Sequence, residues 1–271
     1  PPPAGQSRDQ PPPENPRAYW EPTFAPHQPV STHFRHELGA HGWGNNEPQN
    51  YVASPANSFH TDQGKLVIRA IADSKSSDPF TSARLTSHQT LSRSRGCLAA
   101  RITLPSADGI WPAFWLLPAD PFTWPHDGEI DILESWNGDR VNHSCLHWGF
   151  FNGEDWNKHR VVDTTIPSMG RYDGHTCELV WDMPPTGDGG RIIWYLDGQA
   201  VMKAEKPPGT RRIEHFRIIL NVAMGGNVCN GKVPRDGSYE MVVHELRMCD
   251  DPPGGWQRFE QDWRGCKEGR A

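Results

Sequence analysis

Short runs of strand-forming residues, separated by turn residues, recur along most of the chain. No helical crossovers lie between them, which favours antiparallel pairing. Gly and Pro each number 26 and supply turns, and Asp197-Gly198 is a strong two-residue hairpin signal. The sequence therefore predicts an all-β sandwich of two antiparallel sheets. The clearest predicted strands are KLVIRAIA (65–72), SARLTS (82–87), GCLAARITLP (96–105), AFWLLP (113–118), EIDILESW (129–136), NHSCLHWGFF (142–151), HTCELVWDM (175–183), RIIWYLDGQAVMKA (191–204), FRIILNVAMGG (216–226) and YEMVVHELRMC (239–249).

The 271 residues suit one large domain preceded by a segment of different composition. Residues 1–30 are rich in proline and poor in aliphatic side chains, which predicts an extended N-terminal tail, packed on the surface if ordered. Residues 31–271 show no convincing second boundary and no internal repeat, so we expect one domain there. A single short helix is predicted at 256–263, where three aromatic side chains share a face.

Charge and hydropathy exclude two classes of partner. The formal charge is −6, and no basic stripe is present of the kind that a nucleic-acid-binding protein needs. No segment approaches the roughly 20 apolar residues of a membrane span, and no apolar signal region opens the chain. The proline-rich beginning is that expected of a mature or trimmed product.

Six cysteines predict up to three disulfides and a secreted protein, with buried free thiols as the alternative. Cys249 and Cys266 flank a polar, proline-rich segment, so they are the first pair to test. No CxxC pair and no zinc-like spacing of Cys and His occurs, so no metal site is predicted. The tripeptide NHS at 142–144 is the only glycosylation sequon and supports secretion, with a chance match as the alternative.

Three carboxylates crowd one short hydrophobic segment, DGEIDILESW at 127–136. A regular strand would place Glu129 and Asp131 on one face and Glu134 on the other. A bulge at Ile132–Leu133 would return Glu134 to the face of the other two. Mutual repulsion should then raise at least one pKa. A protonated acid beside an ionised carboxylate, about 5–5.5 Å apart, is the pair that a retaining glycosidase uses. The alternative is an acidic edge strand that discourages aggregation.

The surroundings of this segment favour sugar chemistry. Trp111 and Trp115 lie just upstream and offer platforms for sugar rings, although burial in the core is the usual role of tryptophan. His147 follows on the next predicted strand, where it could position Glu134 or contact a leaving sugar; a purely structural histidine is the alternative. The loop GWGNNEPQNY (42–51) is suited to bonding sugar hydroxyls or is a plain surface turn. Sequence motifs of serine hydrolases, zinc proteases and nucleotide-binding loops are absent.

At EIDILE the sequence resembles glycoside hydrolase family 16, and in particular its laminarinase-like members. Further blocks agree in the family's order between about residues 34 and 248, namely GWGNNEPQNY, TSARLTS, GCLAARITLPSADGIWPAFWLLP, CLHWG and ILNVAMGGN. The resemblance implies a β-jelly-roll with a concave substrate cleft and retaining cleavage of β-1,3-linked or mixed β-1,3/1,4-glucans. The extra residue in E-x-D-x-x-E resembles laminarinases, whereas xyloglucan transglycosylases and bacterial lichenases typically have the shorter E-x-D-x-E.

The same resemblance assigns roles to individual residues. It implies that Glu129 is the nucleophile, Glu134 the general acid/base and Asp131 the assisting residue between them. His147 matches a residue that supports the acid/base or the first aglycone site. Residues that match the family's glycone subsites are Asn46, Arg84, Trp111 and Trp115.

Departures from the family pattern affect the metal and the outer subsites. His244 stands where the family often has a calcium-binding Asp, and histidine is a poor ligand for that hard cation, so we expect no calcium. Pro48 and Cys97 replace a frequent Leu and a frequent Arg, which leaves substrate choice open.

The leading hypothesis is a secreted, monomeric endo-glycosidase that needs no cofactor and whose partner is a β-glucan polysaccharide. An endo-β-1,3-galactanase of the same family, a cell-wall transglycosylase and a non-catalytic glucan-binding protein are the alternatives.

Overall fold

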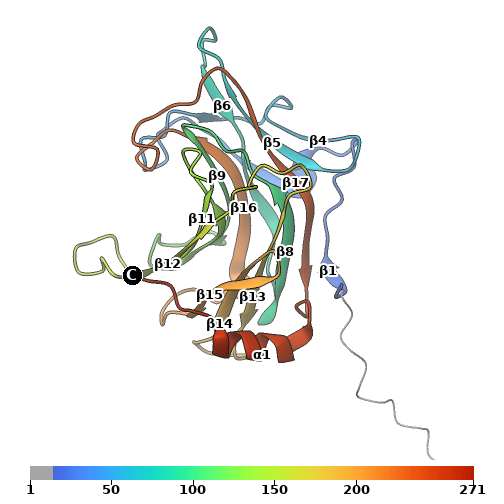
Figure 1. Cartoon of the computed structure of the whole chain (residues 1–271), viewed down its shortest axis with the longest axis vertical. Coiled ribbons are helices and arrows are strands. Elements are labelled where there is room, and N and C mark those ends of the chain that lie inside the picture. Colours follow the sequence, from blue (N-terminus) through green and yellow to red (C-terminus); the bar gives the residue numbers. More distant parts are fainter. Residues whose placement is uncertain (1–14) are drawn as a thin grey trace, which may run out of the picture.

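The predicted strands pair into two curved antiparallel sheets that pack face to face as a β-jelly-roll sandwich (Figure 1). The computed structural model describes residues 15–271. Within this range all strand pairs are antiparallel except β3 with β6, which confirms the all-β prediction. No helix among the described residues is long and apolar enough to cross a membrane.

The seven-stranded sheet is continuous and every neighbouring pair in it is antiparallel. Five of its strands match predicted ones with changed ends: Ile110–Pro118 begins three residues earlier than predicted, whereas Glu129–Glu134 and Phe216–Met224 each end two residues earlier. Neither Phe34–Glu37 nor His159–Thr165 was predicted. In spatial order the strands are β12 (His159–Thr165), β11 (Val141–His147), β10 (Glu129–Glu134), β9 (Ile110–Pro118), β16 (Phe216–Met224), β7 (Arg84–Thr90) and β2 (Phe34–Glu37).

The second sheet has ten strands and carries the predicted hairpin. Asp197 and Gly198 have φ values of 47° and 78°, as a two-residue turn with two positive φ angles requires. Two 3₁₀ turns, η1 (Val30–Thr32) and η2 (Ile213–His215), lie in connections. The strands are β15 (Gln199–Glu205), β14 (Arg191–Leu196), β13 (His175–Asp182), β8 (Arg95–Thr103), β17 (Gly237–Cys249), β5 (Leu66–Ala72), β6 (Phe80–Ser82) and β3 (Asn50–Tyr51), with β1 (Ala18–Trp20) on β17 and β4 (Ser58–His60) on β5.

The main hydrophobic core lies between the two sheets. Leu116 and Ile130 from one sheet, and Leu98 and Leu179 from the other, belong to one buried cluster. Helix α1 (Gly255–Gly265) covers part of the outer face of the ten-stranded sheet through Phe259 (Figure 1). The predicted helix is thus confirmed, and the outer face of the seven-stranded sheet is left to the site described below.

Residues 15–30 are packed more closely than the predicted tail. Strand β1 pairs with β17, and the side chains of Phe24 and Val30 join the main core. The domain boundary predicted between residues 30 and 31 therefore does not separate a tail from the domain, because residues before it contribute to the sheet and to the core. The rest of the predicted tail, residues 1–14, lies outside the described residues.

The disulfide prediction was wrong: all six cysteines are free. The thiol of Cys249 points to Pro16 O at 3.5 Å, whereas that of Cys266 points to Lys267 O at 3.6 Å. The expected pair therefore does not meet. Cys249 instead lies opposite Cys97 in the β8–β17 ladder, deep in the fold. Five of the six are buried, as small side chains that fill apolar positions, and Cys266 is partly exposed.

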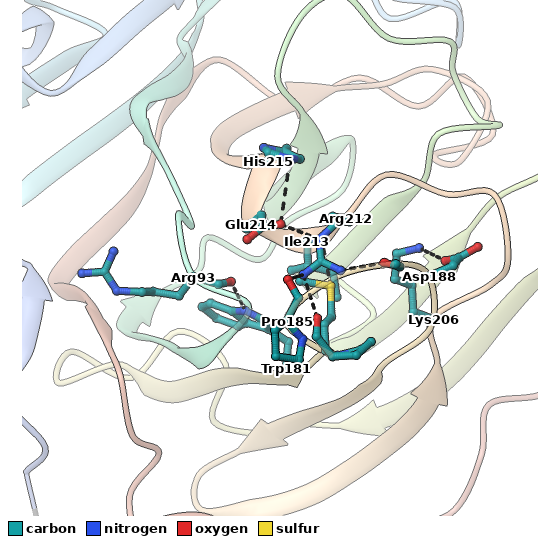
Figure 2. Close-up of polar contacts among 12 residues, drawn as sticks. Arg93, Trp181, Pro185, Asp188, Lys206, Arg212, Ile213, Glu214 and His215 are labelled. Carbon is teal, nitrogen blue, oxygen red and sulfur yellow. Dashed lines mark hydrogen bonds and ion pairs between the residues drawn. The ribbon is translucent and has the colours of Figure 1, made fainter.

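Polar contacts fasten the connections beside β13 and β14. Lys206 is buried, and its ammonium group donates to Asp188 at 2.7 Å (Figure 2). It also donates to Thr210 O at 2.8 Å. Arg212 donates to the carbonyl of Gly187 and pairs with Glu214 (Figure 2). These cations hold the loop that joins β13 to β14 against η2.

Candidate active site

The bulge predicted within the acidic segment is present. Strand β10 pairs with β9 through Asp131 opposite Trp115 and Leu133 opposite Phe114, so Ile132 is an extra residue. The side chains of Ile132 and Leu133 both lie in the core between the sheets. Because two consecutive side chains point inward, the in-and-out pattern of the strand is shifted by one residue after the bulge. Glu134 therefore points to the outer face, as Glu129 and Asp131 do.

All three carboxyl groups line one cavity of about 530 Å³ on the outer face of the seven-stranded sheet. Strands β9, β10, β11, β16 and β7 form its floor, and the loops at 41–47 and 122–124 form its walls. The floor is a sheet held from behind by the core, so the carboxyl groups stand on a rigid support. The other predicted residues that line this cavity are Arg84, Trp111, Trp115 and His147.

Each of the two outer carboxyl groups accepts a hydrogen bond from a tryptophan. Trp111 Nε1 donates to Glu134 Oε1 at 2.8 Å. Trp124 Nε1 donates to Glu129 Oε2 at 2.5 Å. An indole N–H orients a carboxyl group without supplying the positive charge of Lys or Arg. Trp124 was not predicted as a partner; its position five residues before Glu129, in the loop leading into the strand, was the available signal.

Burial and mutual repulsion change the acidity of this group, as the sequence predicted. Burial raises the pKa of Asp131 well above its usual value, and the charge of Glu129 and the hydrogen bond shared with it act in the same direction. Burial also raises the pKa of Glu134, with a further contribution from Asp131 and an opposing one from the Trp111 hydrogen bond. The site can therefore keep an acid protonated beside an ionised carboxylate.

His147 faces the same group from strand β11, directly opposite Glu129 in the ladder. Its Nε2 lies 3.2 Å from Asp131 Oδ2, and a positive charge on the ring would lower the pKa of Glu134. The histidine thus contacts the middle carboxyl group of the three. Its suggested role toward the acid/base or the leaving sugar stays a prediction.

Arg84 and Trp115 form a stacked wall at one end of the cavity. The Arg84 guanidinium lies between the rings of Trp43 and Trp115, 4.7 Å and 4.8 Å from their centroids. Trp115 Nε1 donates to Asn221 Oδ1 at 2.7 Å, which fixes the indole on the floor. Trp43 and Asn221 were missed, because a loop residue and an interior position of a distant strand give no local signal of sharing a wall.

Asn46 does not line the cavity, unlike its neighbour Asn45. Asn46 has a φ of 57° and donates to Asn227 Oδ1 at 3.0 Å at the exposed rim. A Gly- and Asn-rich turn does not reveal from its sequence which of two adjacent asparagines points inward. A role for Asn46 in sugar binding stays a prediction.

Among the described residues, one group of potential metal ligands is compact enough to hold an ion, and it belongs to this cluster. Single donor atoms of Asp131, Cys145 and His147 lie within 4.8 Å of one another. Burial and the nearby carboxylates raise the pKa of the Cys145 thiol, whereas metals bind the thiolate. These donors fit a metal poorly, and we assign none. His244, at the expected calcium position, contacts Thr103 Oγ1 at 2.8 Å.

The sequon at 142–144 lies at the back of the site. Asn142 is 1% exposed, and its carboxamide is engaged in hydrogen bonds within the sandwich. A glycan on this nitrogen has no room in the fold, so the sequon offers no support for secretion.

A carboxyl pair set by a bulged strand, on the tryptophan-lined face of a β-jelly-roll, defines a polysaccharide-cleaving hydrolase. A family model described as "XgeA-like, catalytic GH16 domain" matches residues 48–178. The chain belongs to glycoside hydrolase family 16 and is a glycoside hydrolase.

Curated relatives and a solved structure agree with this assignment. A glucan endo-1,3-beta-glucosidase of Cryptopygus antarcticus is 34% identical over 217 residues, covering 72% of this chain and 76% of the relative. Glucan endo-1,3-beta-glucosidase A1 of Niallia circulans is 34% identical over 216 residues, 71% of this chain but only 30% of that longer relative. The laminarinase structure from Rhodothermus marinus superposes with a TM-score of 0.70 at 28% identity, covering 86% of this chain and 97% of that one.

Proposed function

We propose that this protein is an endo-β-1,3-glucanase that cleaves its polysaccharide with retention of configuration. The observation that carries the proposal is the bulge at Ile132, which brings Glu129 and Glu134 into one cavity. The likeness to proteins named as glucan endo-1,3-beta-glucosidases and laminarinases supports the choice of substrate.

In the proposed first step, the Glu129 carboxylate attacks the anomeric carbon while Glu134 donates its proton to the departing glycosidic oxygen. The raised pKa of Glu134 keeps that proton available at a pH where an ordinary carboxyl group has lost it. The bond from Trp124 holds Glu129, and the bond from Trp111 holds Glu134.

In the second step Glu134, now ionised, removes a proton from water, and the hydroxide oxygen displaces Glu129 from the anomeric carbon. Asp131 shares a hydrogen bond with Glu129, so it can stabilise the carboxylate as it leaves the sugar. His147 contacts the carboxyl group of Asp131, with its Nε2 3.2 Å from Asp131 Oδ2.

Product analysis on defined polymers tests this proposal. We expect new reducing ends from laminarin, and proton NMR should show the β anomer first. The α anomer as first product would refute retention, and cleavage of β-1,3-galactan but not laminarin would refute the glucan assignment. Products longer than a supplied oligosaccharide would identify a transglycosylase, and saturable binding without any product would identify a binding protein.

An extracellular location and a monomeric state are part of the same proposal. An extracellular polysaccharide is too large to cross a membrane, so a hydrolase that cleaves it acts outside the cell; neither the cysteines nor the sequon supports this location. Size-exclusion chromatography with light scattering should give a mass near 30.5 kDa for the chain. A mass of twice that value would refute the monomer.

A further inference from the structure

The bulge in β10 interrupts the ladder on the β11 side of the site. The paired residues are Glu129 with His147, Ile130 with Leu146 and Asp131 with Cys145, and the ladder ends there. Continuing the register would place Glu134 opposite Asn142. Backbone groups of residues beyond Asp131 therefore need other partners, because an unpaired buried N–H or C=O is costly.

The side chain of Asn142 supplies those partners. Its Oδ1 accepts the backbone N–H of Glu134 at 2.8 Å, and its Nδ2 donates to the carbonyl of Ile132 at 3.2 Å. One carboxamide thus bonds to the extra residue and to the residue two positions later. Nδ2 also lies 3.4 Å from the hydroxyl of Ser144, which is completely buried.

These bonds come from the interior side of the sheet. Asn142 is 1% exposed and shares a strand face with Leu146 of the core, whereas His147 lines the cavity from the other face of β11. A buried carboxamide is unfavourable unless its donor and acceptor are both used. Asparagine meets the requirement because it carries an acceptor and a donor on one planar group, as the missing backbone partner would. An ionised aspartate has no donor, and alanine has neither.

We propose that Asn142 is a positioning residue that holds the bulge in the one conformation that presents Glu134 to the cavity. It contacts no substrate and acts through the Glu134 backbone. This inference rests on the proposed role of Glu134 as general acid. A displacement of about 1 Å at a reacting group can cost about 10²-fold in rate, so loss of the clamp should be visible in catalysis.

The chain offers a matched control on the other sheet. Asn57 is 2% exposed, and its Nδ2 donates to Arg69 O at 3.0 Å and to Thr81 Oγ1 at 3.1 Å. Asn57→Ala removes a buried carboxamide with similar partners away from the cavity. It should lower the melting temperature by an amount similar to Asn142→Ala while leaving activity at 25 °C within twofold.

The experiment measures kcat/KM on two substrates that differ in their need for an acid. Cleavage of laminarin requires protonation of a sugar oxygen, whereas a dinitrophenyl β-laminaribioside has a leaving group that departs unprotonated. For Asn142→Ala we expect about a 10²-fold loss on laminarin and less than about a threefold loss on the aryl glycoside. Equal losses on both substrates, or none on either, would overturn the positioning role.

A second variant keeps the test decisive if Asn142→Ala does not fold. Protonated aspartic acid offers one acceptor and one donor, as the amide does. The activity of Asn142→Asp relative to wild type should therefore rise as pH falls, and a ratio independent of pH would contradict the clamp. Wild-type protein that cleaves neither substrate would instead refute the proposed function itself.

Discussion

Two carboxyl groups on opposite sides of this sandwich, Glu134 and Glu260, lie in different settings, and their pKa values change in opposite directions. In the cavity, Glu134 is buried beside Asp131 and its pKa is raised. On helix α1, Glu260 accepts two hydrogen bonds from Arg191, at 2.9 Å and 2.6 Å, and its pKa is lowered. Asp188, held by Lys206 in Figure 2, likewise has a lowered pKa.

The opposite pKa shifts follow from the groups that contact each carboxyl group. Cations stabilise the ionised form of Glu260 and Asp188, and those pairs fasten surface elements to the sheet. Tryptophan N–H groups hold Glu134 and Glu129 in place without a full positive charge. Glu134 is buried and oriented by an indole N–H rather than by a cation, so it retains a proton for chemistry, which distinguishes it from the carboxylate of a structural ion pair.

The largest expected effect is on activity. Glu134→Gln should lower kcat on laminarin by about 10²–10⁴-fold, because the acid and base are lost with little change of shape. Glu129→Gln should lower it at least as much. The matched variant Glu260→Gln should stay within twofold of wild type. Reducing-end assays on all three variants would contradict the comparison if Glu260→Gln lost as much as Glu134→Gln.

Glu134→Gln should also have a smaller effect on stability: the substitution that lowers activity should raise the melting temperature. The folded state holds the Glu134 proton more tightly than the unfolded chain does, so its contribution is present below the ordinary carboxyl pKa and is lost as pH rises through the raised value. At neutral pH, Glu134→Gln should therefore melt about 2–4 °C higher than wild type, equivalent to about 1 kcal/mol. The gain should vanish below about pH 4.

Glu260→Gln serves as the control for that melting experiment. Its lowered pKa means that its contribution is present above the ordinary carboxyl pKa and is lost as pH falls through the lowered value. The substitution should slightly lower the melting temperature at neutral pH, by an amount typical of an exposed ion pair, about 0–1 kcal/mol. Equal shifts in the same direction for both variants would remove the distinction between the two settings.

The smallest effect is expected from Trp111→Phe. The hydrogen bond from Trp111 lowers the pKa of Glu134, so its removal should raise that pKa further. The acid then stays protonated to higher pH. The alkaline limb of the kcat/KM profile should move upward by about 0.4–1.1 pH units, since a neutral hydrogen bond contributes about 0.5–1.5 kcal/mol. A downward shift of that limb would contradict the assignment of Glu134 as the acid.

The bulge could be predicted from the sequence because it has a local signature. Charges at 129, 131 and 134 with apolar residues at 130, 132 and 133 fit one strand only if a residue is inserted. The predicted strands and helix also have local sequence patterns, and most of them were confirmed. Strand β12 (HRVVDTT) was missed because its charged and polar residues blur the alternation.

The contacts that complete the site depend on strand pairing, which local patterns do not encode. Nothing in the sequence shows that Asn142 reaches the bulge, that Trp43 stacks on Arg84 or that Asn46 turns to the rim. The cysteine prediction failed for a related reason, since an even count says nothing about which side chains meet.

The measurement that tests the account most directly is covalent trapping of the nucleophile. A 2-deoxy-2-fluoro-laminaribioside with a dinitrophenyl leaving group should form a glycosyl-enzyme and release it slowly, because fluorine destabilises both transition states while the leaving group assists only the first. Peptide mass spectrometry should find one sugar adduct on Glu129, and none in Glu129→Gln. An adduct on Glu134 or Asp131, or steady turnover without any adduct, would contradict the proposed division of roles within the carboxyl cluster.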